Sequence, residues 1–269
     1  MRLATWNVNS IRTRVARTVE FAVREDIDVL AMQEIKCKPE QFPYGPFEEA
    51  GYQVEVHGLN QWNGVAIASR LPMSDVRTGF DGMPGFAKGH EGPDAPLEAR
   101  ALGVMVDGVR VWSLYVPNGR ALDDPHMPYK LQWLETLKDQ AAGWIKENPD
   151  LPLALMGDWN IAPEDDDVWD IELFRRENHT HVSEPERRAF RAFLEAGFTD
   201  VARPYTPGPG VYTYWDYTQL RFPKKEGMRI DFVLGSPAFA ARVTGASIDR
   251  EERKGKGASD HAPVMVELD

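Results

Sequence analysis

Apolar residues recur along this chain in short runs separated by polar turns, with a few longer stretches of helical spacing between them. Short, mainly apolar runs predict β-strands that are buried in a sheet. They cover residues 2–7, 28–33, 64–69, 101–106, 109–116, 153–156, 230–234 and 262–268, with a weaker signal at 240–248. The dipeptide Asp107-Gly108 separates two of these runs and predicts a tight hairpin. The pattern indicates a protein with many strands.

Three stretches have the spacing of amphipathic helices. The first begins after Ser10, a residue type that caps helices, and runs to about Glu25, because its apolar side chains recur every three or four positions. A longer one covers 129–147. The third begins at Ser183, where the sequence Ser-Glu-Pro-Glu resembles a capping box with proline in the first turn, and runs towards Ala196.

Strands and helices alternate along the whole chain, so the fold class is α/β or α+β. This pattern alone does not distinguish two packed sheets from one open sheet. Residues 79–96 are rich in glycine and proline, which predicts an exposed loop rather than a linker. The sequence has no low-complexity tract and no short repeat, so we expect a single domain over residues 1–269.

The composition is that of a globular protein, with 42% hydrophobic and 27% charged residues. The formal net charge of −11 argues against a general polyanion binder with a broad basic surface. It leaves room for a nucleic-acid enzyme, because carboxylates that hold a metal ion add negative charge while the metal restores positive potential locally. Basic residues gather near 12–17, 221–225 and 250–256, and each segment is as readily solvated surface as a binding patch.

The sequence also bears on where the protein works. Its single cysteine, Cys37, excludes an internal disulfide and fits a reducing compartment. No apolar run approaches the roughly 20 residues that a membrane helix needs. The N-terminal residues lack the apolar core of a signal peptide. We therefore expect a cytoplasmic protein that does not enter a membrane.

Polar residues able to bind a metal or a phosphate stand where the predicted strands end or begin. They are Asn7, Glu34, Asp158, Asn160, Asp231, Asp260 and His261. If these loops meet at one edge of the fold, they form a pocket suited to a hard, oxygen-ligated cation and to acid–base chemistry. The lack of clustered cysteine and histidine argues against zinc. Taken singly, each residue has a plainer role as a cap or turn former, so the inference depends on their joint occurrence.

Longer segments around these residues span nearly the whole chain. They are Thr-Trp-Asn-Val-Asn at 5–9, Gln-Glu-Ile-Lys at 33–36, Asn-Gly-Val-Ala at 63–66, Tyr-Val-Pro-Asn-Gly at 115–119, Gly-Asp-Trp-Asn-Ile-Ala at 157–162, Tyr-Thr-Tyr-Trp-Asp-Tyr at 212–217, Arg-Ile-Asp at 229–231 and Ser-Asp-His-Ala-Pro-Val at 259–264. In this order they resemble the exonuclease III family of abasic endonucleases, within the wider endonuclease–exonuclease–phosphatase superfamily. The resemblance implies a four-layer sandwich, in which two mixed β-sheets pack face to face with helices on the outside.

The resemblance also implies a metal site and a nucleophile. Glu34 is expected to be the main ligand of a Mg²⁺ ion, for which Mn²⁺ can substitute. Asn7 and Asp260 would assist it directly or through water. Asp158, together with Asn160, is expected to orient and deprotonate the attacking water.

Further roles concern the phosphate itself. His261, positioned by Asp231, is expected to hydrogen-bond a nonbridging phosphate oxygen or to transfer a proton. Tyr115 and Asn118 are expected to contact the phosphate where charge builds up. Whether Asp158, Tyr115 or the His261–Asp231 pair is the general base stays open at this level.

Substrate recognition depends on a second group of residues. Tyr214, Trp215, Met228 and Ile230 match family positions beside the pocket for a flipped-out abasic sugar, and core packing is the alternative role for all four. A small apolar pocket favours a sugar without its base. Relatives often have an aromatic residue where Met228 stands, and methionine is more adaptable, which leaves the tightness of the pocket open.

Two charged features allow more than one interpretation. Arg120 and Lys130 lie near the Tyr115 segment and can bind backbone phosphates or simply lie on the surface. Three consecutive carboxylates at 165–167 resemble a metal cluster, but neighbouring carboxylates seldom converge on one ion, so we expect a solvated loop there.

The resemblance, together with the polar residues at the strand ends, implies a hydrolase, a DNA-repair phosphodiesterase. It is expected to incise duplex DNA 5′ to abasic sites and to act as a 3′-to-5′ exonuclease that trims 3′ ends, as a monomer. A superfamily phosphohydrolase for a lipid or small phosphate ester is the first alternative; the acidic charge favours it slightly, and the segment 214–217 opposes it. A DNA-binding relative without catalysis is the second, which the complete polar set opposes.

Overall fold

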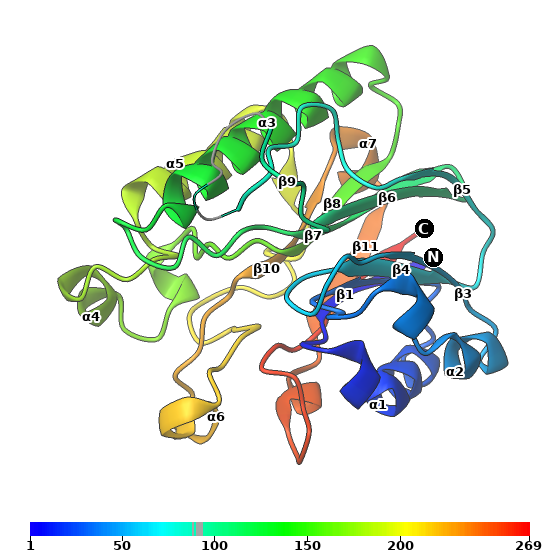
Figure 1. Cartoon of the computed structure of the whole chain (residues 1–269), viewed down its shortest axis with the longest axis horizontal. Helices are drawn as coiled ribbons and strands as arrows, with labels where there is room; N and C mark the ends of the chain where they lie inside the picture. Colours follow the sequence, from blue (N-terminus) through cyan, green and yellow to red (C-terminus); the bar gives the residue numbers. More distant parts are fainter. Residues whose placement is uncertain (88, 90–93) are drawn as a thin grey trace.

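The computed structural model describes residues 1–87, 89 and 94–269 (Figure 1). Within these residues the strands form two six-stranded sheets. The first has the order β11-β12-β1-β2-β4-β3 and consists of β1 (Arg2–Asn7), β2 (Val29–Gln33), β3 (Gln53–His57), β4 (Val65–Ser69), β11 (Val243–Ile248) and β12 (Val264–Leu268). The second has the order β5-β6-β7-β8-β10-β9 and consists of β5 (Met73–Arg77), β6 (Ala101–Val106), β7 (Val109–Tyr115), β8 (Leu153–Asp158), β9 (Thr199–Asp200) and β10 (Asp231–Gly235).

Each sheet is mixed. β1 and β2 are parallel, as are β7 and β8, whereas the other neighbouring strands are antiparallel. A hydrophobic cluster joins side chains of both sheets, among them Val29 and Ile67 from the first and Val111 and Met156 from the second. Because the central strands are buried on both faces, they appear in the sequence as continuous apolar runs rather than alternating ones.

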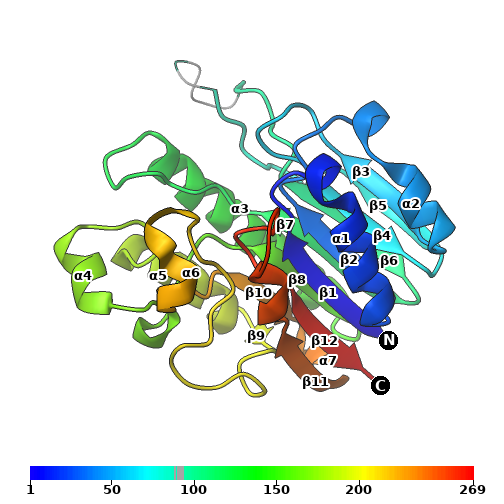
Figure 2. The same ribbon diagram turned by 90° about the horizontal axis from the view of Figure 1, so that it is seen from below.

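Helices cover the two outer faces (Figure 2). α1 (Ile11–Arg24) and α2 (Tyr44–Glu49) pack Phe21 and Phe47 against the first sheet. α3 (His126–Glu147) and α5 (Glu184–Glu195) pack Trp133 and Phe190 against the second. The result is the four-layer sandwich that the resemblance implied, and this prediction is confirmed.

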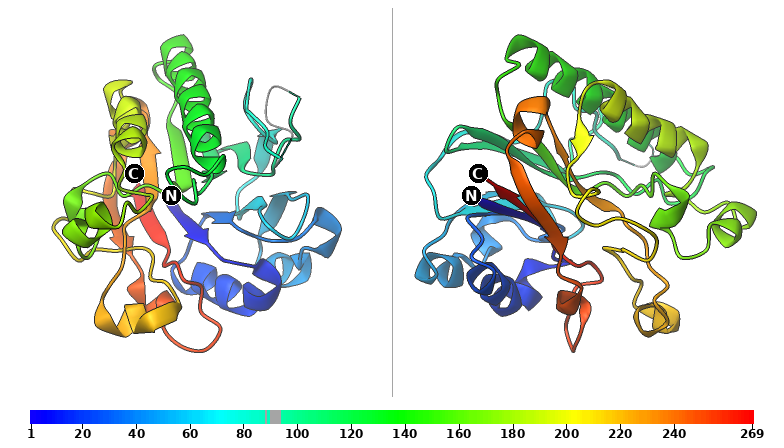
Figure 3. Two further views of the ribbon diagram at one scale, coloured as in Figure 1. Left: turned by 60° about the vertical axis from the view of Figure 1, so that its left-hand side comes forward. Right: turned by 180° about the vertical axis from the view of Figure 1, so that it is seen from behind.

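Short elements complete the structure. α4 (Ile171–Arg176) and α6 (Arg221–Lys224) lie at one end of the molecule, and α7 (Pro237–Ala240) follows β10 (Figure 1). Single 3₁₀ turns occur at Pro39–Gln41, Asp165–Asp167, Thr218–Leu220 and Arg250–Arg253. The two termini lie side by side because β1 and β12 are antiparallel neighbours, and the Met1 amino group donates to the Leu268 carbonyl at 2.9 Å (Figure 3). No helix in the described part of the chain is both long enough and apolar enough to cross a membrane.

Several predicted boundaries need correction. Ser10 makes no capping hydrogen bond through its side chain; its backbone has a φ of 83°, and its N–H donates to the Glu34 carbonyl. The hydroxyl of Ser183 likewise bonds the Glu186 carboxylate rather than the helix backbone. The strand predicted at 240–248 begins at Val243, since the preceding residues form α7.

The prediction of an exposed loop at 79–96 is only partly correct. Phe80 and Met83 are buried against Trp133 of α3, so the first part of this loop belongs to the core. Residues 88 and 90–93 of the same stretch lie outside the described residues.

Candidate active site

The ends of parallel strands bring the predicted polar residues to one edge of the sandwich. β1 and β2 end together in the first sheet, and Tyr115 of β7 lies opposite Asp158 of β8 in the second. β10 runs antiparallel, so Asp231 begins it opposite Asp158. Gly157 allows β8 to lie this close to β7, because a Cβ at that position would lie 1.9 Å from the Leu114 carbonyl oxygen.

Asn7 joins the two sheets at this edge. It is fully buried, and its Nδ2 donates to Glu34 Oε1 and to Asp158 Oδ2, both at 2.9 Å. Its Oδ1 accepts a hydrogen bond from the Asn9 backbone at 3.0 Å. A single amide therefore holds one carboxylate from each sheet.

His261 lies between two buried aspartates. Its Nδ1 is 2.9 Å from Asp231 Oδ2, and its Nε2 is 3.7 Å from Asp158 Oδ2. Burial acts to lower the pKa of His261, but the charges of Asp231 and Asp158 outweigh it and raise that pKa. The raised pKa favours the protonated imidazole, in which both ring nitrogens are donors.

Asp158 is a strongly perturbed carboxyl group. Burial raises its pKa, the charges of Asp231 and Glu34 raise it further, and the charge of His261 opposes them. Its Oδ1 accepts the Asn160 backbone N–H at 2.9 Å, so the side chain is fixed by the turn that follows β8. A carboxylate with a raised pKa is a better proton acceptor than an ordinary aspartate.

The pKa of Glu34 is shifted in the opposite direction from that of Asp158. Burial acts to raise its pKa, but the charge of Lys36 and hydrogen bonds from Asn7 and Lys36 outweigh it and lower that pKa. The Lys36 ammonium lies 2.8 Å from Glu34 Oε2 and donates to Asn9 Oδ1 at 2.7 Å. Asn9 Nδ2 in turn donates to Asp260 Oδ1 at 3.0 Å. Lys36 and Asn9 thus connect Glu34 with Asp260, although neither was among the predicted site residues.

Two asparagines and a tyrosine lie beside Asp158. Asn118 Nδ2 donates to Asn160 Oδ1 at 2.9 Å, and Asn160 Nδ2 donates to the Val116 carbonyl at 2.9 Å. The pKa of Tyr115 is raised well above its ordinary value, chiefly by burial and then by the charge of Glu34. Tyr115 therefore keeps its proton and acts as a donor.

Backbone strain gathers around these residues. Non-glycine residues near the site with φ between 43° and 76° are Asn9, Glu34, Lys36, Arg120, Asn160 and His181. Such conformations are uncommon for residues with a Cβ and persist where the surrounding structure enforces them. They turn the chain sharply at the strand ends and so direct these side chains to the edge.

The predicted substrate-binding residues divide into two groups. Tyr214 and Met228 line a cavity of about 200 Å³, and the Tyr214 ring centroid is 4.9 Å from that of His261. Trp215 and Ile230 are 1% and 2% exposed and lie in hydrophobic clusters, as core packing would require. The remaining wall of the cavity includes Trp169, Leu173, Phe174, His179, His181, Asp216, Arg221, Glu226 and Gly227.

The two predicted phosphate-binding cations are placed differently. Arg120 is exposed next to Asn118, whose Oδ1 accepts the Arg120 backbone N–H at 3.1 Å. Lys130 is fully buried, where it donates to the Asn160 carbonyl at 2.6 Å and pairs with Glu186. The prediction that Lys130 lies on the surface is therefore wrong. Its buried ammonium supports the turn after β8 through the Asn160 carbonyl.

His181 is a site residue that the sequence did not reveal. Its Nε2 lies 3.3 Å from Asn160 Oδ1 and 3.4 Å from Asn118 Nδ2, and its backbone N–H donates to Glu186. Burial lowers its pKa to about 4, so the ring is neutral. No motif surrounds it, and only the fold brings it to this position.

The solvated loop expected at 165–167 is confirmed for Asp165 and Asp166, which are exposed, but not for Asp167. Asp167 is fully buried and pairs with Arg203 at 2.6 Å, whereas Asp165 pairs with Arg187 at 2.6 Å. Only Asp167 exchanges solvent for an ion pair inside the protein, so it supports the fold, whereas Asp165 keeps 48% of its side chain exposed beside Arg187.

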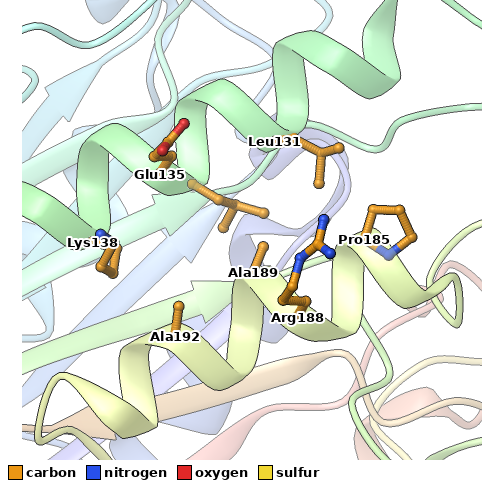
Figure 4. Close-up of a pocket in the computed structure, with 8 residues that line it drawn as sticks. Leu131, Glu135, Lys138, Pro185, Arg188, Ala189 and Ala192 are labelled. Atoms are coloured by element: carbon orange, nitrogen blue, oxygen red, sulfur yellow. The ribbon is translucent and has the colours of Figure 1, made fainter.

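A second cavity, of about 270 Å³, lies between α3 and α5 (Figure 4). Its wall combines alanines with Glu135, Lys138 and Arg188. None of the converging polar residues described above lines it. The candidate active site is therefore the strand-end edge.

The donor set at this edge fits a divalent cation. Asp158, Asp231 and His261 are buried and offer ligand atoms within 4.8 Å of one another. Glu34 is anionic and keeps 16% of its side-chain surface exposed, as a carboxylate ligand for a hard cation requires. Asp231 Oδ1 is buried without a hydrogen-bond partner among the described residues.

A two-sheet sandwich with carboxylates, amides and a charged histidine converging at one edge defines a hydrolase of phosphate esters. The chain belongs to the Endonuclease/Exonuclease/phosphatase family, whose model matches residues 4–261. It is 30% identical to an exodeoxyribonuclease of Bacillus subtilis over 99% of this chain and 98% of that protein.

Two solved structures show more closely which type of phosphate-ester hydrolase this chain resembles. A 3′ phosphatase from Neisseria, bound to a product DNA hairpin, is 36% identical with a TM-score of 0.90, covering 100% of this chain and 99% of that one. An abasic endonuclease from Archaeoglobus fulgidus is 34% identical with a TM-score of 0.90, again over 100% and 99% of the two chains. The predicted resemblance is thereby confirmed, and the chain is a hydrolase of the exonuclease III and abasic endonuclease type.

Proposed function

We propose that this protein is a Mg²⁺-dependent DNA-repair phosphodiesterase that incises duplex DNA 5′ to abasic sites and trims 3′ ends. The observation that carries the proposal is the Asn7 amide, which holds Glu34 and Asp158 together at 2.9 Å each from opposite sheets. The relatives named as an exodeoxyribonuclease, a 3′ phosphatase and an abasic endonuclease support DNA as the substrate. A monomeric, cytoplasmic enzyme of one domain remains part of this proposal.

Asp158 is proposed as the general base. Its raised pKa makes it a competent proton acceptor, and Asn160 and Asn7 fix both of its oxygens. The side chain of Asn160 is itself held by the Val116 carbonyl and Asn118, so the turn that fixes Asp158 is supported from both sides.

Glu34 is proposed as the metal ligand, with Asp260 and Asn7 in support. Bound Mg²⁺, or Mn²⁺ in its place, would supply positive charge to polarise the phosphate and stabilise the leaving oxygen. Asn7 turns its nitrogen towards Glu34, so it orients the carboxylate by a hydrogen bond. Magnesium keeps several of its waters and needs only one or two carboxylates, which suits this sparse set.

Three donors are proposed to bind the phosphate as negative charge builds up. His261 is held protonated by Asp231 and Asp158, Tyr115 keeps its phenol proton, and Asn118 presents an amide nitrogen. Donors fixed in advance in a buried site are the largest usual contribution to such catalysis.

The cavity beside His261 is proposed to receive the extrahelical sugar. Tyr214 and Met228 form its wall next to the imidazole, with Trp215 and Ile230 supporting them from the core. Arg120, exposed beside Asn118, is proposed to contact a flanking backbone phosphate.

The test is a nuclease assay on defined substrates. With Mg²⁺, the purified protein should nick a duplex carrying one abasic-site analogue on its 5′ side, shorten a 3′-recessed duplex, and stop when EDTA is added. A phosphoinositide panel run in parallel tests the lipid-phosphate alternative. No cleavage of either DNA above background at stoichiometric enzyme would overturn the proposal, and turnover of the phosphoinositides alone would replace it.

A further inference from the structure

Arg100 is a buried arginine directly beside Tyr115. It immediately precedes β6, and Tyr115 ends β7, the antiparallel neighbour of β6. The Tyr115 backbone N–H donates to the Arg100 carbonyl at 2.8 Å. The Arg100 side chain then folds back, so that Nη1 donates to the Tyr115 carbonyl at 3.3 Å and Cζ lies 4.7 Å from the centroid of the Tyr115 ring. Tyr115 is thus held through its backbone and its ring by one residue.

Glu98 fixes the guanidinium in this position. Arg100 Nε donates to Glu98 Oε2 at 2.7 Å. The same carboxylate accepts hydrogen bonds from Asn63 Nδ2 at 3.1 Å and from the Tyr129 hydroxyl at 3.2 Å. Three separate parts of the chain therefore converge on Glu98, and Arg100 itself is only 8% exposed.

The chemistry of this contact is specific to arginine. A planar guanidinium can pair with a carboxylate through one edge, donate to a carbonyl through another and stack on an aromatic face at the same time. A lysine at this position would keep the charge, but it would lose the planar face that stacks on the ring and the second nitrogen that donates to the carbonyl. A buried charge is costly unless it is paired, so such a group needs the close partners seen here.

The ring supported in this way faces the proposed reaction centre. Tyr115 lies opposite Asp158 of β8, and burial together with the charges of Glu34 and Asp158 raises its pKa. A displacement of the ring would therefore move the phenol relative to both carboxylates. Displacements of about 1 Å at a reaction centre can lower turnover by about 100-fold.

We propose that Arg100 is a positioning residue for catalysis, which stacks on Tyr115 and holds its hydroxyl at the scissile phosphate while Glu98 anchors the guanidinium. This inference rests on the proposed role of Tyr115 in the phosphodiesterase reaction. It assigns Arg100 no contact with DNA. Its effect passes through the tyrosine.

A double-mutant cycle tests this assignment. Tyr115→Phe should lower kcat on the abasic duplex by about 100-fold, as expected for loss of one donor to the developing charge. Arg100→Met should lower kcat by about 10- to 100-fold with KM nearly unchanged, because a position is lost rather than a binding contact. In the Tyr115→Phe background, Arg100→Met should cost no more than about twofold further, because the two residues act as a unit.

Arg110→Met is the matched control. Arg110 lies on β7 near the opposite end from Tyr115, is also buried and also pairs with a carboxylate, that of Asp75. The control should lose stability in thermal unfolding but keep the native kcat. If Arg100→Met does not fold, Glu98→Gln, which removes only the charge of the anchor, should still lower kcat by about tenfold with KM unchanged.

A readout without DNA separates this inference from the proposed function. In protein with ¹³C-labelled tyrosine, the Tyr115 ring signal, assigned by its loss in Tyr115→Phe, should shift in Arg100→Met and not in Arg110→Met. An unshifted signal overturns the inference whether or not the protein cleaves DNA. A raised KM with native kcat, additive losses in the cycle, or full rescue by Arg100→Lys would also overturn it.

Discussion

Replacing Asp231 by asparagine isolates the electrostatic part of the site. Asp231 is fully buried, and its Oδ2 lies 2.9 Å from His261 Nδ1. Asparagine has nearly the same shape and still offers one oxygen to the imidazole N–H, so the substitution removes the charge and keeps the contact. In the native protein, burial acts to lower the pKa of His261, and the charges of Asp231 and Asp158 outweigh it and raise that pKa.

The size of the expected loss in kcat follows from the strength of one charge-assisted hydrogen bond, about 1.5–3 kcal/mol. At about 1.4 kcal/mol per factor of ten, losing this support for the imidazolium should lower kcat by about 10- to 100-fold near neutral pH. The direction with pH follows from the sign of the shift. Without Asp231, the pKa of His261 falls towards its ordinary value, so the variant loses the protonated ring as pH rises through neutrality, while the native protein keeps it to higher pH.

The assay is steady-state incision of an abasic duplex in Mg²⁺ across acidic, neutral and alkaline buffers. The deficit of Asp231→Asn should be smallest in acidic buffer and largest in alkaline buffer. Asp75→Asn is the matched control. Asp75 lies on β5, the edge strand of the same sheet, and its carboxylate pairs with Arg110. A variant with native kcat and an unchanged pH profile would refute the view that Asp231 maintains a cationic His261.

Three further changes probe the rest of the site. Asp158→Asn should lower kcat by about 10²- to 10⁴-fold while DNA affinity, measured by fluorescence anisotropy, stays close to native; near-native turnover would exclude Asp158 as the base. Glu34→Gln should raise the Mg²⁺ concentration needed for half-maximal activity, and an unchanged metal titration would remove Glu34 as the ligand. Lys130→Met should lower the free energy of unfolding in urea by about 3–5 kcal/mol, because it leaves Glu186 buried without its partner; a loss below about 1 kcal/mol would contradict that account of the pair.

The central strands were predictable because burial on both faces leaves a direct record in the sequence. Residues 101–106 are buried almost throughout, and the prediction there agrees with β6 to the residue. The edge strands β3 and β5 have no such apolar run in the sequence, since their residues are partly or fully exposed. An exposed strand is specified by its neighbour rather than by its own apolar pattern.

The types of residue in the candidate site were also predictable, but their contacts were not. Asn7 could be placed at the end of a strand, yet only the packed sheets show that its amide joins Glu34 to Asp158. Lys130 resembled a surface cation, and only the fold shows it buried against Asn160 and Glu186.

By itself, the sequence determined the local properties of this protein: which runs are buried, where strands end, and which polar groups stand at those ends. Those properties depend on residues close together in the chain. The tertiary structure decided which ends meet, how buried each charge is, and therefore which way each pKa moves. Asp231 and His261, 30 positions apart, influence each other only because β10 and β12 each run antiparallel to a strand that ends at this edge, so both strands begin there. Charge and burial act through space, so the chemistry of this edge becomes defined only when both sheets are in place.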